Sequence, residues 1–406
     1  MFKTILQVAY RNAYLRKSRA LLLILMIGLS MGVMVSIEGL YDGMSMNMID
    51  RTKRSDSGEI SLYANKYRLE HVIKYRISDA DKKVLALQKI TGVTEALYRL
   101  EVDGLAQTAR KSKPSILLGI DLDDEKKFGK FEEFLKEGEL DFGKNSAFIG
   151  GGLAKKLKVK IGSKVIFTAQ DSQNEIKSIA LRIRAIIRSS NINFDERALY
   201  IPRGEAARFL SVKQNSATQI ALRTDETHTP TLQTTLQAKY PKLSVYTFAQ
   251  LYPQLQQMQT MMDVFNTITF MIVMIVVFIG ILGVMYVSIL DRIREFGILL
   301  SIGYAYRYIR YQIMIEALLL GLAGYFLGLF VGLLILSYLT YQGLDLTLFA
   351  EGMEAFGMSS VIYASIKSSY FISTLFAIII ASLLSVVLPL RKIKKLNPVE
   401  VIRSAG

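Results

Sequence analysis

Residues that could do chemistry are scarce in this sequence. Its 406 residues contain no cysteine and only two histidines, His71 and His228. The lack of cysteine removes thiolate nucleophiles, disulfides and cysteine zinc ligands, and neither histidine has a second ligand at metal spacing. No arrangement of Ser, His and Asp can be placed, and no carboxylate of the polar region 42–262 lies in an apolar stretch that would raise its pKa for acid catalysis. We therefore expect no catalytic residue and no metal site.

Two short patterns imitate ligand sites. Gly138, Gly143 and Lys144 have the spacing of a phosphate-binding loop, but Asn145 stands where Ser or Thr would bind Mg²⁺, and no strand-then-helix context surrounds them. The acidic cluster 121–125 could bind a cation weakly, although a solvated turn is the simpler interpretation. We expect no cofactor on this chain, so ATP and Mg²⁺ would have to be bound by a partner.

Four apolar runs are long enough to cross a membrane, which takes about 20 helical residues. They cover residues 20–37, 264–290, 313–339, with Glu316 near its start, and 371–390. The first run could be the core of a signal peptide. It exceeds the usual length of such a core, however, and no small-x-small cleavage site follows it, which favours an uncleaved anchor.

The charge pattern indicates how these runs are oriented. The formal charge is +15, and the flanks before the first run, between the second and third, and after the fourth hold fourteen Lys and Arg against three acidic residues. The loop between the third and fourth runs holds Lys367 as its one basic residue. By the positive-inside rule, both termini and the middle loop are cytoplasmic and the large polar region faces the other side. Nucleic acid is not an expected partner, because no basic face with aromatic platforms is visible.

The polar region reads as short strands, turns and a few amphipathic helices. The expected strands cover residues 59–64, 96–109, 115–120, 147–149, 164–168, 179–187, 198–201, 218–222 and 243–246, and the expected helices 79–89, 203–210 and 231–239. The fold class is therefore an α+β membrane protein. One transmembrane helix comes first, then a large mixed α+β domain with a central lobe near 115–203, then three transmembrane helices.

The second span is expected to continue beyond the membrane as a stalk. Leu251, Leu255, Met258, Met262 and Phe265 alternate at spacings of four and three, so a helical seam runs into the span. A helix over 249–290 would be about 60 Å long, twice the hydrocarbon thickness. Leu40, Met44 and Met48 extend the first span in the same way. The alternative is that these two helices only pack against each other and have no mechanical role.

These observations divide the chain into nine segments. In order they are a basic amphipathic segment (1–19), a first span (20–41), the α+β domain (42–248), the stalk with the second span (249–290), a cytoplasmic loop (291–311), a third span (312–340), an extracytoplasmic loop (341–369), a fourth span (370–390) and a basic tail (391–406).

Methionine and glycine suggest different roles within the spans. Twelve of the 16 methionines lie in the first two spans and their extensions, and flexible Met side chains suit surfaces that accept varied apolar partners. One hypothesis is an adaptable cavity for lipid chains or hydrophobic peptides, and plain core filling is the other. The cavity would be lined by Met31, Met34, Met44, Met48, Met258, Met262 and Phe265. Glycines recur every four residues, which lets helix backbones approach closely; they are Gly28, Gly32, Gly324, Gly328 and Gly332.

The most specific segment is RIREFGILLSIG at residues 292–303, which resembles the signature of FtsX-like permease domains of ABC transporters. The segments at 8–23, 41–67, 151–169 and 388–404 are also similar to permeases of the macrolide-exporter and lipoprotein-releasing type. The resemblance covers nearly the whole chain. It implies a periplasmic domain of the MacB type and a place in a bacterial inner membrane.

The resemblance also implies a mechanism and partners. A separate dimeric ATPase would clamp the cytoplasmic loop, and the stalks would carry its closure to the periplasmic domain. The coupling segment would be formed by Arg294, Glu295, Phe296, Gly297, Ser301 and Gly303. A short charged loop that exposes Phe296 and Ile298 could form the docking anchor. Four spans are too few to enclose a cavity, so a second copy or a sister permease is expected beside this chain, with membrane lipid around both.

Among such permeases, the chain looks most similar to the lipoprotein-releasing (LolC/LolE-like) subunits. The stretch 169–177 (AQDSQNEIK) is nevertheless short and proline-free, where the subunit that hands cargo to a periplasmic carrier has a longer hook with proline. Docking of a carrier or adaptor therefore stays open. Extraction of lipoproteins or other amphiphiles is the first hypothesis for function. Export of small hydrophobic molecules or peptides is the second, and non-transporting regulation of a cell-wall hydrolase, as in FtsX proper, is the third.

Overall fold

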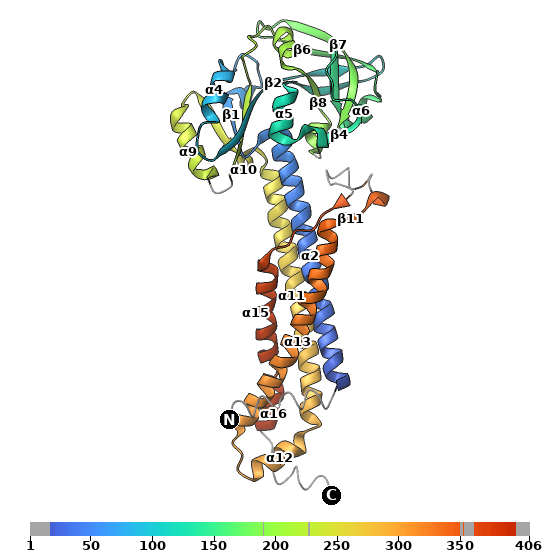
Figure 1. Cartoon of the computed structure of the whole chain (residues 1–406), viewed down its shortest axis with the longest axis vertical. Coiled ribbons are helices and arrows are strands. Elements are labelled where there is room, and N and C mark those ends of the chain that lie inside the picture. Colours follow the sequence, from blue (N-terminus) through green and yellow to red (C-terminus); the bar gives the residue numbers. More distant parts are fainter. Residues whose placement is uncertain (1–16, 190, 226–227, 350–351, 353–360, 395–406) are drawn as a thin grey trace. The chain divides into compact units, whose positions relative to one another are not determined.

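The computed structural model describes residues 17–189, 191–225, 228–349, 352 and 361–394 (Figure 1). The chain divides into two compact units. The helical unit comprises Met1–Met44, Gln259–Asp345 and Val361–Gly406, and the sheet unit comprises Ser45–Met258 and Leu346–Ser360. The expected basic segments 1–16 and 395–406, and residues 350–351 and 353–360 of the expected loop, lie outside the described residues.

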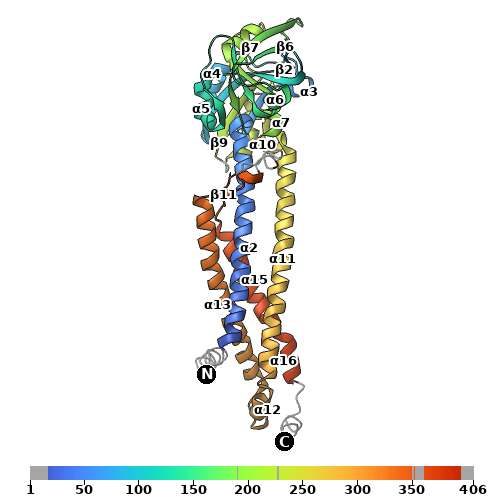
Figure 2. The same ribbon diagram turned by 90° about the vertical axis from the view of Figure 1, so that its right-hand side faces the viewer.

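The helical unit is built on four long helices, which lie alongside one another in Figure 2. They are α2 (Lys17–Thr52), α11 (Pro253–Leu290), α13 (Tyr306–Tyr341) and α15 (Ser368–Ser385). Within the described residues, four helices are long and apolar enough to cross a membrane, and these are the four. Two short helices, α12 (Ile293–Ser301) and α16 (Val387–Lys394), and a small hairpin of β11 (Leu344–Asp345) and β12 (Val361–Ile362) complete the unit.

Glycine spacing explains how α2 packs on α13. A Cβ added to Gly328 would lie 2.8 Å from the Cβ of Met31 and 3.0 Å from the carbonyl oxygen of Gly28. One added to Gly332 would lie 3.5 Å from the Cα of Gly32, and one added to Gly324 would lie 2.6 Å from the Cβ of Ile27. The five glycines singled out by their spacing thus meet at one contact, where the two backbones approach closely.

The sheet unit contains one ten-stranded sheet with the order β10-β1-β9-β2-β3-β8-β5-β7-β4, in which β6 pairs with β2 and β7. Two pairs, β3 with β8 and β5 with β7, are parallel, and the other described pairs are antiparallel. The strands are β1 (Ile60–Ala64), β2 (Val93–Gln107), β3 (Ser112–Ile120), β4 (Leu135–Gly138), β5 (Ser146–Gly150), β6 (Lys164–Gln170), β7 (Ile176–Ile187), β8 (Ala198–Pro202), β9 (Gln219–Thr224) and β10 (Leu243–Thr247).

Short helices accompany the sheet. They are η1 (Lys53–Ser57), a π-helix that continues α2, α3 (Tyr67–Glu70), α4 (Ala80–Leu87), α5 (Leu122–Gly129), η2 (Phe131–Phe134), α6 (Gly151–Leu157), α7 (Ile192–Asp195), α8 (Arg203–Phe209), α9 (Thr229–Lys239) and α10 (Phe248–Leu251). A further short helix, η3 (Thr347–Phe349), follows β11 and has no buried residue. The mixed α+β class predicted from the sequence is confirmed.

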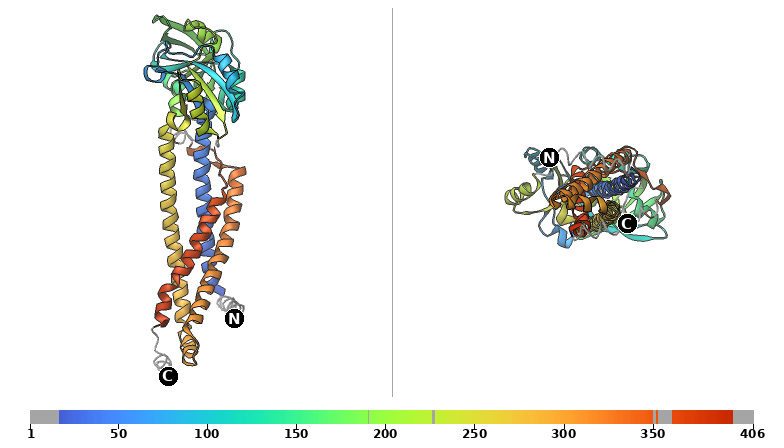
Figure 3. Two further views of the ribbon diagram at one scale, coloured as in Figure 1. Left: turned by 90° about the vertical axis from the view of Figure 1, so that its left-hand side faces the viewer. Right: turned by 90° about the horizontal axis from the view of Figure 1, so that it is seen from below.

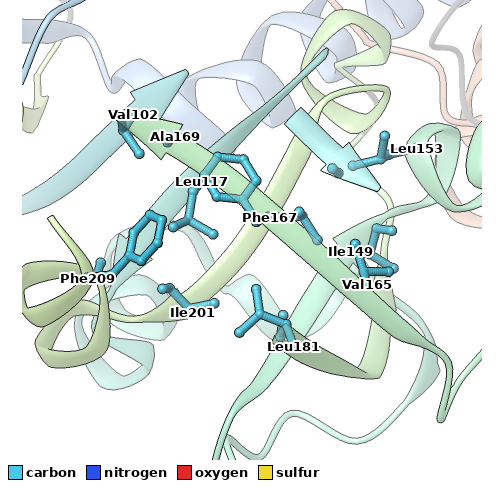
Figure 4. Close-up of a cluster of buried hydrophobic side chains, with 14 of the residues drawn as sticks. Val102, Leu117, Ile149, Leu153, Val165, Phe167, Ala169, Leu181, Ile201 and Phe209 are labelled. Carbon is cyan, nitrogen blue, oxygen red and sulfur yellow. The ribbon is translucent and has the colours of Figure 1, made fainter. Parts of the chain in front are cut away.

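The long strand β2 joins two lobes. Its first half pairs with β9 over the core beneath α4 and α9. Its second half, from Leu100, pairs with β3 and β6. There Leu117, Phe167 and Leu181 belong to the largest apolar cluster of the sheet unit (Figure 4). The strands β3 to β8 run from Ser112 to Pro202, and the separate central lobe expected at 115–203 stays a prediction.

Two boundaries differ from those expected. The long helix before the second span begins at Pro253 instead of residue 249, because a proline fits the first turn of a helix but restricts the residue before it. The residues 291–311, expected as a loop, contain the nine-residue helix α12 between the end of α11 and the start of α13 (Figure 3).

Candidate functional site

The helix α12 is the element of the candidate coupling site, and its sequence explains where it ends. Gly303 has φ of +88°, a left-handed conformation that favours glycine. The N–H of Tyr304 donates to the carbonyl of Leu299 at 2.9 Å, and that of Gly303 donates to Leu300 at 3.1 Å, as in the turns that close many helices. The hydroxyl of Ser301 donates to the carbonyl of Gly297 at 2.9 Å. Ser301 and Gly303 therefore shape the end of α12.

The buried face of α12 corrects one expectation. Phe296 was expected to be exposed, but only 1% of it is accessible. It belongs to the apolar cluster of the helical unit together with Ile309 and Ile313 of α13. Gly297 is buried beside it. The expectation was wrong because hydropathy within a loop does not show which side chains a following helix will cover.

The exposed face of α12 carries a different set of groups. Arg294 and Glu295 are exposed, as are Ile298 (48%) and Ile302 at the C-terminal end (74%). Arg294, Ile298 and Ile302 follow at intervals of four, so they share one face of the helix. This face combines one cation with two isoleucines, which suits a protein partner more than solvent.

Arg292, just before α12, fixes the helix to its neighbour. Its Nε lies 3.1 Å from a carboxylate oxygen of Glu295, and its Nη1 lies 3.1 Å from a carboxylate oxygen of Glu316 in α13. Its guanidinium also lies 5.0 Å from the centre of the Phe296 ring. Sequence reasoning treated Arg292 as one charge among many. The signal that could have identified it was Glu316, a carboxylate inside an apolar run that needs a partner.

The methionines do not form one visible site. Met31 and Met34 are buried in the helical unit, and Met31 packs on Gly328, so these two fill the core in this structure. Phe265 is exposed on α11. Met48 is buried, and Met44, Met258 and Met262 are partly buried. A substrate role for these last five residues stays a prediction.

A cavity of about 340 Å³ opens elsewhere in the helical unit, and none of the seven residues proposed for a cavity lines it. Its walls come from α2, α11 and α15, and eight of the nine residues that line it have polar side chains. The nine are Glu38, Asp42, Asp263, Asn266, Thr267, Phe270, Ser369, Tyr370 and Ser373. Asp42 accepts hydrogen bonds from Lys367 and from the hydroxyl of Tyr370.

A buried polar network in the sheet unit was missed entirely by sequence reasoning. The guanidinium of Arg99 on β2 forms two hydrogen bonds with the carboxylate of Glu125, one of them at 2.6 Å. Burial alone would lower the pKa of Arg99, but the Glu125 carboxylate outweighs it and raises that pKa above the usual value. Arg99 also donates to the carbonyl of Asp56 in η1, whose carboxylate accepts from the hydroxyl of Tyr252. The segments that follow α2 and precede α11 thus meet at one buried cluster.

The two patterns that imitate ligand sites have structural explanations. Asp121 accepts hydrogen bonds from the N–H groups of Asp123 and Asp124 at the start of α5, and Arg203 lies 3.4 Å from Asp121 and 3.3 Å from Asp124. The acidic cluster therefore caps a helix and forms ion pairs instead of a merely solvated turn. Asn145 is followed by strand β5 in place of the helix that a phosphate loop requires. Within the described ranges, no three His, Asp or Glu side chains lie close enough together to hold a metal ion.

Family models match most of the chain. The model of the FtsX-like permease C-terminal region matches residues 267–398, and that of the MacB-like periplasmic core domain matches residues 20–239, more than half of the sequence. The fold and these matches define a membrane permease with a large inserted domain. The chain belongs to the family of FtsX-like permeases that carry a MacB-like periplasmic core domain. Permeases of this family work with ABC ATPase partners.

Solved structures resemble part of the chain. The extracellular domain of YknZ, a noncanonical ABC-type transporter from Gram-positive bacteria, is 12% identical; the match covers 46% of this chain and 99% of that one, with a TM-score of 0.32. The periplasmic region of MacB from Actinobacillus actinomycetemcomitans is 13% identical; the match covers 48% of this chain and 92% of that one, with a TM-score of 0.33. No curated protein matches the sequence.

Proposed function

We propose that this chain is the permease subunit of an ABC transporter that extracts or exports lipoproteins or related amphiphiles, driven by ATP hydrolysis in a separate ATPase dimer. The observation that carries the proposal is α12. It presents Arg294, Ile298 and Ile302 on its exposed face while Phe296 and Arg292 fix its other face. A small helix with an apolar exposed face and a rigid buried face suits docking into the groove of a partner.

The long helices support a mechanical route from that contact. α2 and α11 each contribute residues to both units, and at 1.5 Å per residue each is about 55 Å long, well beyond the 30 Å of hydrocarbon. A displacement at the cytoplasmic end of such a helix reaches the sheet unit without passing through a flexible linker. In this arrangement the chain crosses a bacterial inner membrane, with both termini in the cytoplasm and the sheet unit in the periplasm.

The surface of α11 supports a second permease beside this one. Many of its apolar side chains remain exposed: Met261, Val264, Phe265, Ile268, Met271, Ile272, Ile275, Val276 and Ile279. In a membrane this face contacts lipid or another permease, and one chain with four helices encloses little space. A homodimer or a pair with a sister permease would place two such faces around an apolar passage suited to acyl chains.

Mass spectrometry of the complex purified from native membranes tests this function. Recovery of an ABC ATPase together with acylated proteins or lipids supports it. Recovery of an ATPase with small hydrophobic solutes would instead favour the second hypothesis, the export of small hydrophobic molecules or peptides. A soluble cell-wall hydrolase without any cargo contradicts transport.

The docking face itself is tested by Ile298→Asp. We expect at least a tenfold loss of copurified ATPase, because a charge replaces an apolar contact. Ile161→Asp, at an isoleucine of the sheet unit that is 46% exposed against 48% for Ile298, is the matched control and should retain the ATPase. Equal recovery with both variants would refute the role of α12.

A further inference from the structure

A buried carboxylate interrupts the third long helix. Glu316 lies ten residues into α13 and is only 4% exposed. Ile313 and Ala317, its neighbours in the sequence, belong to the apolar cluster of the helical unit. An ionised carboxylate in such surroundings is unfavourable unless a cation compensates it, and in membrane helices such residues usually serve a function.

The cation is Arg292, and it connects three elements. Arg292 follows the end of α11, donates from Nη1 to Glu316 of α13 at 3.1 Å, and donates from Nε to Glu295 of α12 at 3.1 Å. Because a guanidinium is planar and its donors have fixed directions, holding two carboxylates sets the angle between the elements that carry them. A lysine, with one rotatable ammonium, would not set that angle.

The surroundings separate this contact from an ordinary surface ion pair. The side chains of Arg292 and Glu316 are 10% and 6% exposed, whereas Glu295 is 63% exposed. The Phe296 ring lies against the guanidinium, so the same arginine contacts both the polar and the apolar part of the first turn of α12. A buried pair is screened little by salt, and it is costly to break because one charge remains uncompensated.

We propose that Glu316 is a positioning residue for the coupling helix. Through Arg292 it fixes the angle between α12 and α13, so that displacement of α12 by a docked ATPase moves α13 instead of bending the connection at residues 302–305. The proposal rests on the proposed function for the source of the displacement. The fixed angle itself is a property of the permease alone and is measurable without the ATPase.

The chain is well suited to that measurement because it has no cysteine. Spin labels at Ile302→Cys and Phe326→Cys occupy exposed positions at the end of α12 and in α13. Phe326 lies about 30 Å along α13 from Tyr306, the first residue of that helix. The distance between the two labels therefore falls within the range of pulsed electron paramagnetic resonance. In full-length permease in phospholipid nanodiscs we expect one narrow distance distribution with Glu316 present, and one at least twofold wider with Glu316→Gln.

Two comparisons separate positioning from general destabilisation. Gln312→Leu removes another buried polar side chain one turn away and should leave the distribution unchanged. The exchanged pair Arg292→Glu with Glu316→Arg should restore much of the narrow distribution. An unchanged width with Glu316→Gln overturns the proposal, and so does equal widening with Gln312→Leu. Should Glu316→Gln fail to accumulate in membranes, Arg292→Lys provides the same test, and a width like that of the wild type overturns the proposal.

The ATPase complex supplies the functional readout. Glu316→Gln should retain the copurified ATPase, since Ile298 and Ile302 are unchanged, and should lower ATP hydrolysis by the complex in phospholipid vesicles at least fivefold. If ATP hydrolysis is unchanged while the distance distribution is widened, the proposal that movement is transmitted to α13 is wrong. A wild-type permease that binds no ATPase at all would instead refute the proposed function, and the distance result would stand.

Discussion

At the scale of single residues, Asp171 shows how one carboxylate can hold a turn between two strands. It lies in the turn between β6 and β7, within the short, proline-free stretch 169–177. One carboxylate oxygen accepts from the N–H groups of Gln173 at 2.8 Å and Glu175 at 3.0 Å. The other accepts from the hydroxyl of Ser211 at 3.0 Å and lies 2.6 Å from the ammonium of Lys177.

These contacts give the turn a defined dependence on pH. The hydrogen bond from Lys177, followed by those from the backbone, lowers the pKa of Asp171 well below its usual range. A carboxylate with a lowered pKa in the folded state stabilises that state above its unfolded pKa of about 3.9 and loses the effect as the pH falls through the folded value. The turn should therefore stay ordered at pH 4 and loosen only in stronger acid.

Asp171→Asn tests this role at neutral pH. The amide keeps the size of the side chain but loses the charge that Lys177 and the backbone N–H groups favour. We expect amide hydrogen exchange at Gln173 and Glu175 to accelerate at least fivefold, as measured by mass spectrometry. Asp141→Asn, which replaces an exposed carboxylate 3.8 Å from Arg184, is the control and should change nothing at these amides. Equal exchange in wild type and Asp171→Asn would refute the role.

Residues of this kind mark the limit of what the sequence predicted. Asp171 lies within the short, proline-free stretch that the sequence singled out at 169–177, yet its partner Ser211 is forty residues away. Arg99 and Glu125 likewise come from separate elements, and Tyr252 and Asp56, which share a hydrogen bond, are 196 residues apart in the sequence. Such contacts depend on how strands are paired, and no local pattern encodes them. Phe296 was misjudged for the same reason, because the apolar cluster that buries it is built from several helices.

At the scale of elements, local patterns predicted far more. The four long helices followed from apolar runs, since a run of that length has few other stable environments. Most strands were found from alternating residues, whereas β4 and the short helices α5 and α6 were missed because four to eight residues carry little periodicity. Glycine spacing was informative because it reports directly how closely two backbones can approach.

The α2–α13 contact makes a sharp prediction. Gly328→Leu should force the two helices apart, because even its Cβ would meet Met31 at 2.8 Å and the backbone of Gly28 at 3.0 Å. Overpacking of this kind costs about 1–3 kcal/mol, visible as a lower melting temperature of the purified permease. Gly283→Leu in α11, where an added Cβ finds nothing within 4 Å, is the matched control. A melting temperature lowered equally by both changes would show that the close contact contributes nothing specific.

At the scale of the whole molecule, the charge distribution predicts which side of the membrane each unit faces. The basic flanks adjoin α2, α12 and α16, and α12 carries the proposed docking face for a cytoplasmic ATPase. The sheet unit, matched by the model of a periplasmic core domain, is then predicted to face the opposite side of the membrane. The orientation and the proposed function therefore depend on each other, and an ATPase cannot reach α12 if the orientation is reversed.

Single cysteines can report this orientation without background, because the chain has none of its own. Leu69→Cys places a thiol at a position of the sheet unit that is 87% exposed, and Ile302→Cys places one at the end of α12 that is 74% exposed. With a membrane-impermeant maleimide we expect labelling at position 69 in intact spheroplasts and at position 302 only after lysis. Because both thiols are similarly accessible within their units, a difference in labelling reports the membrane and not local burial. Labelling at position 302 before lysis would reverse the orientation and remove the basis for docking a cytoplasmic ATPase on α12.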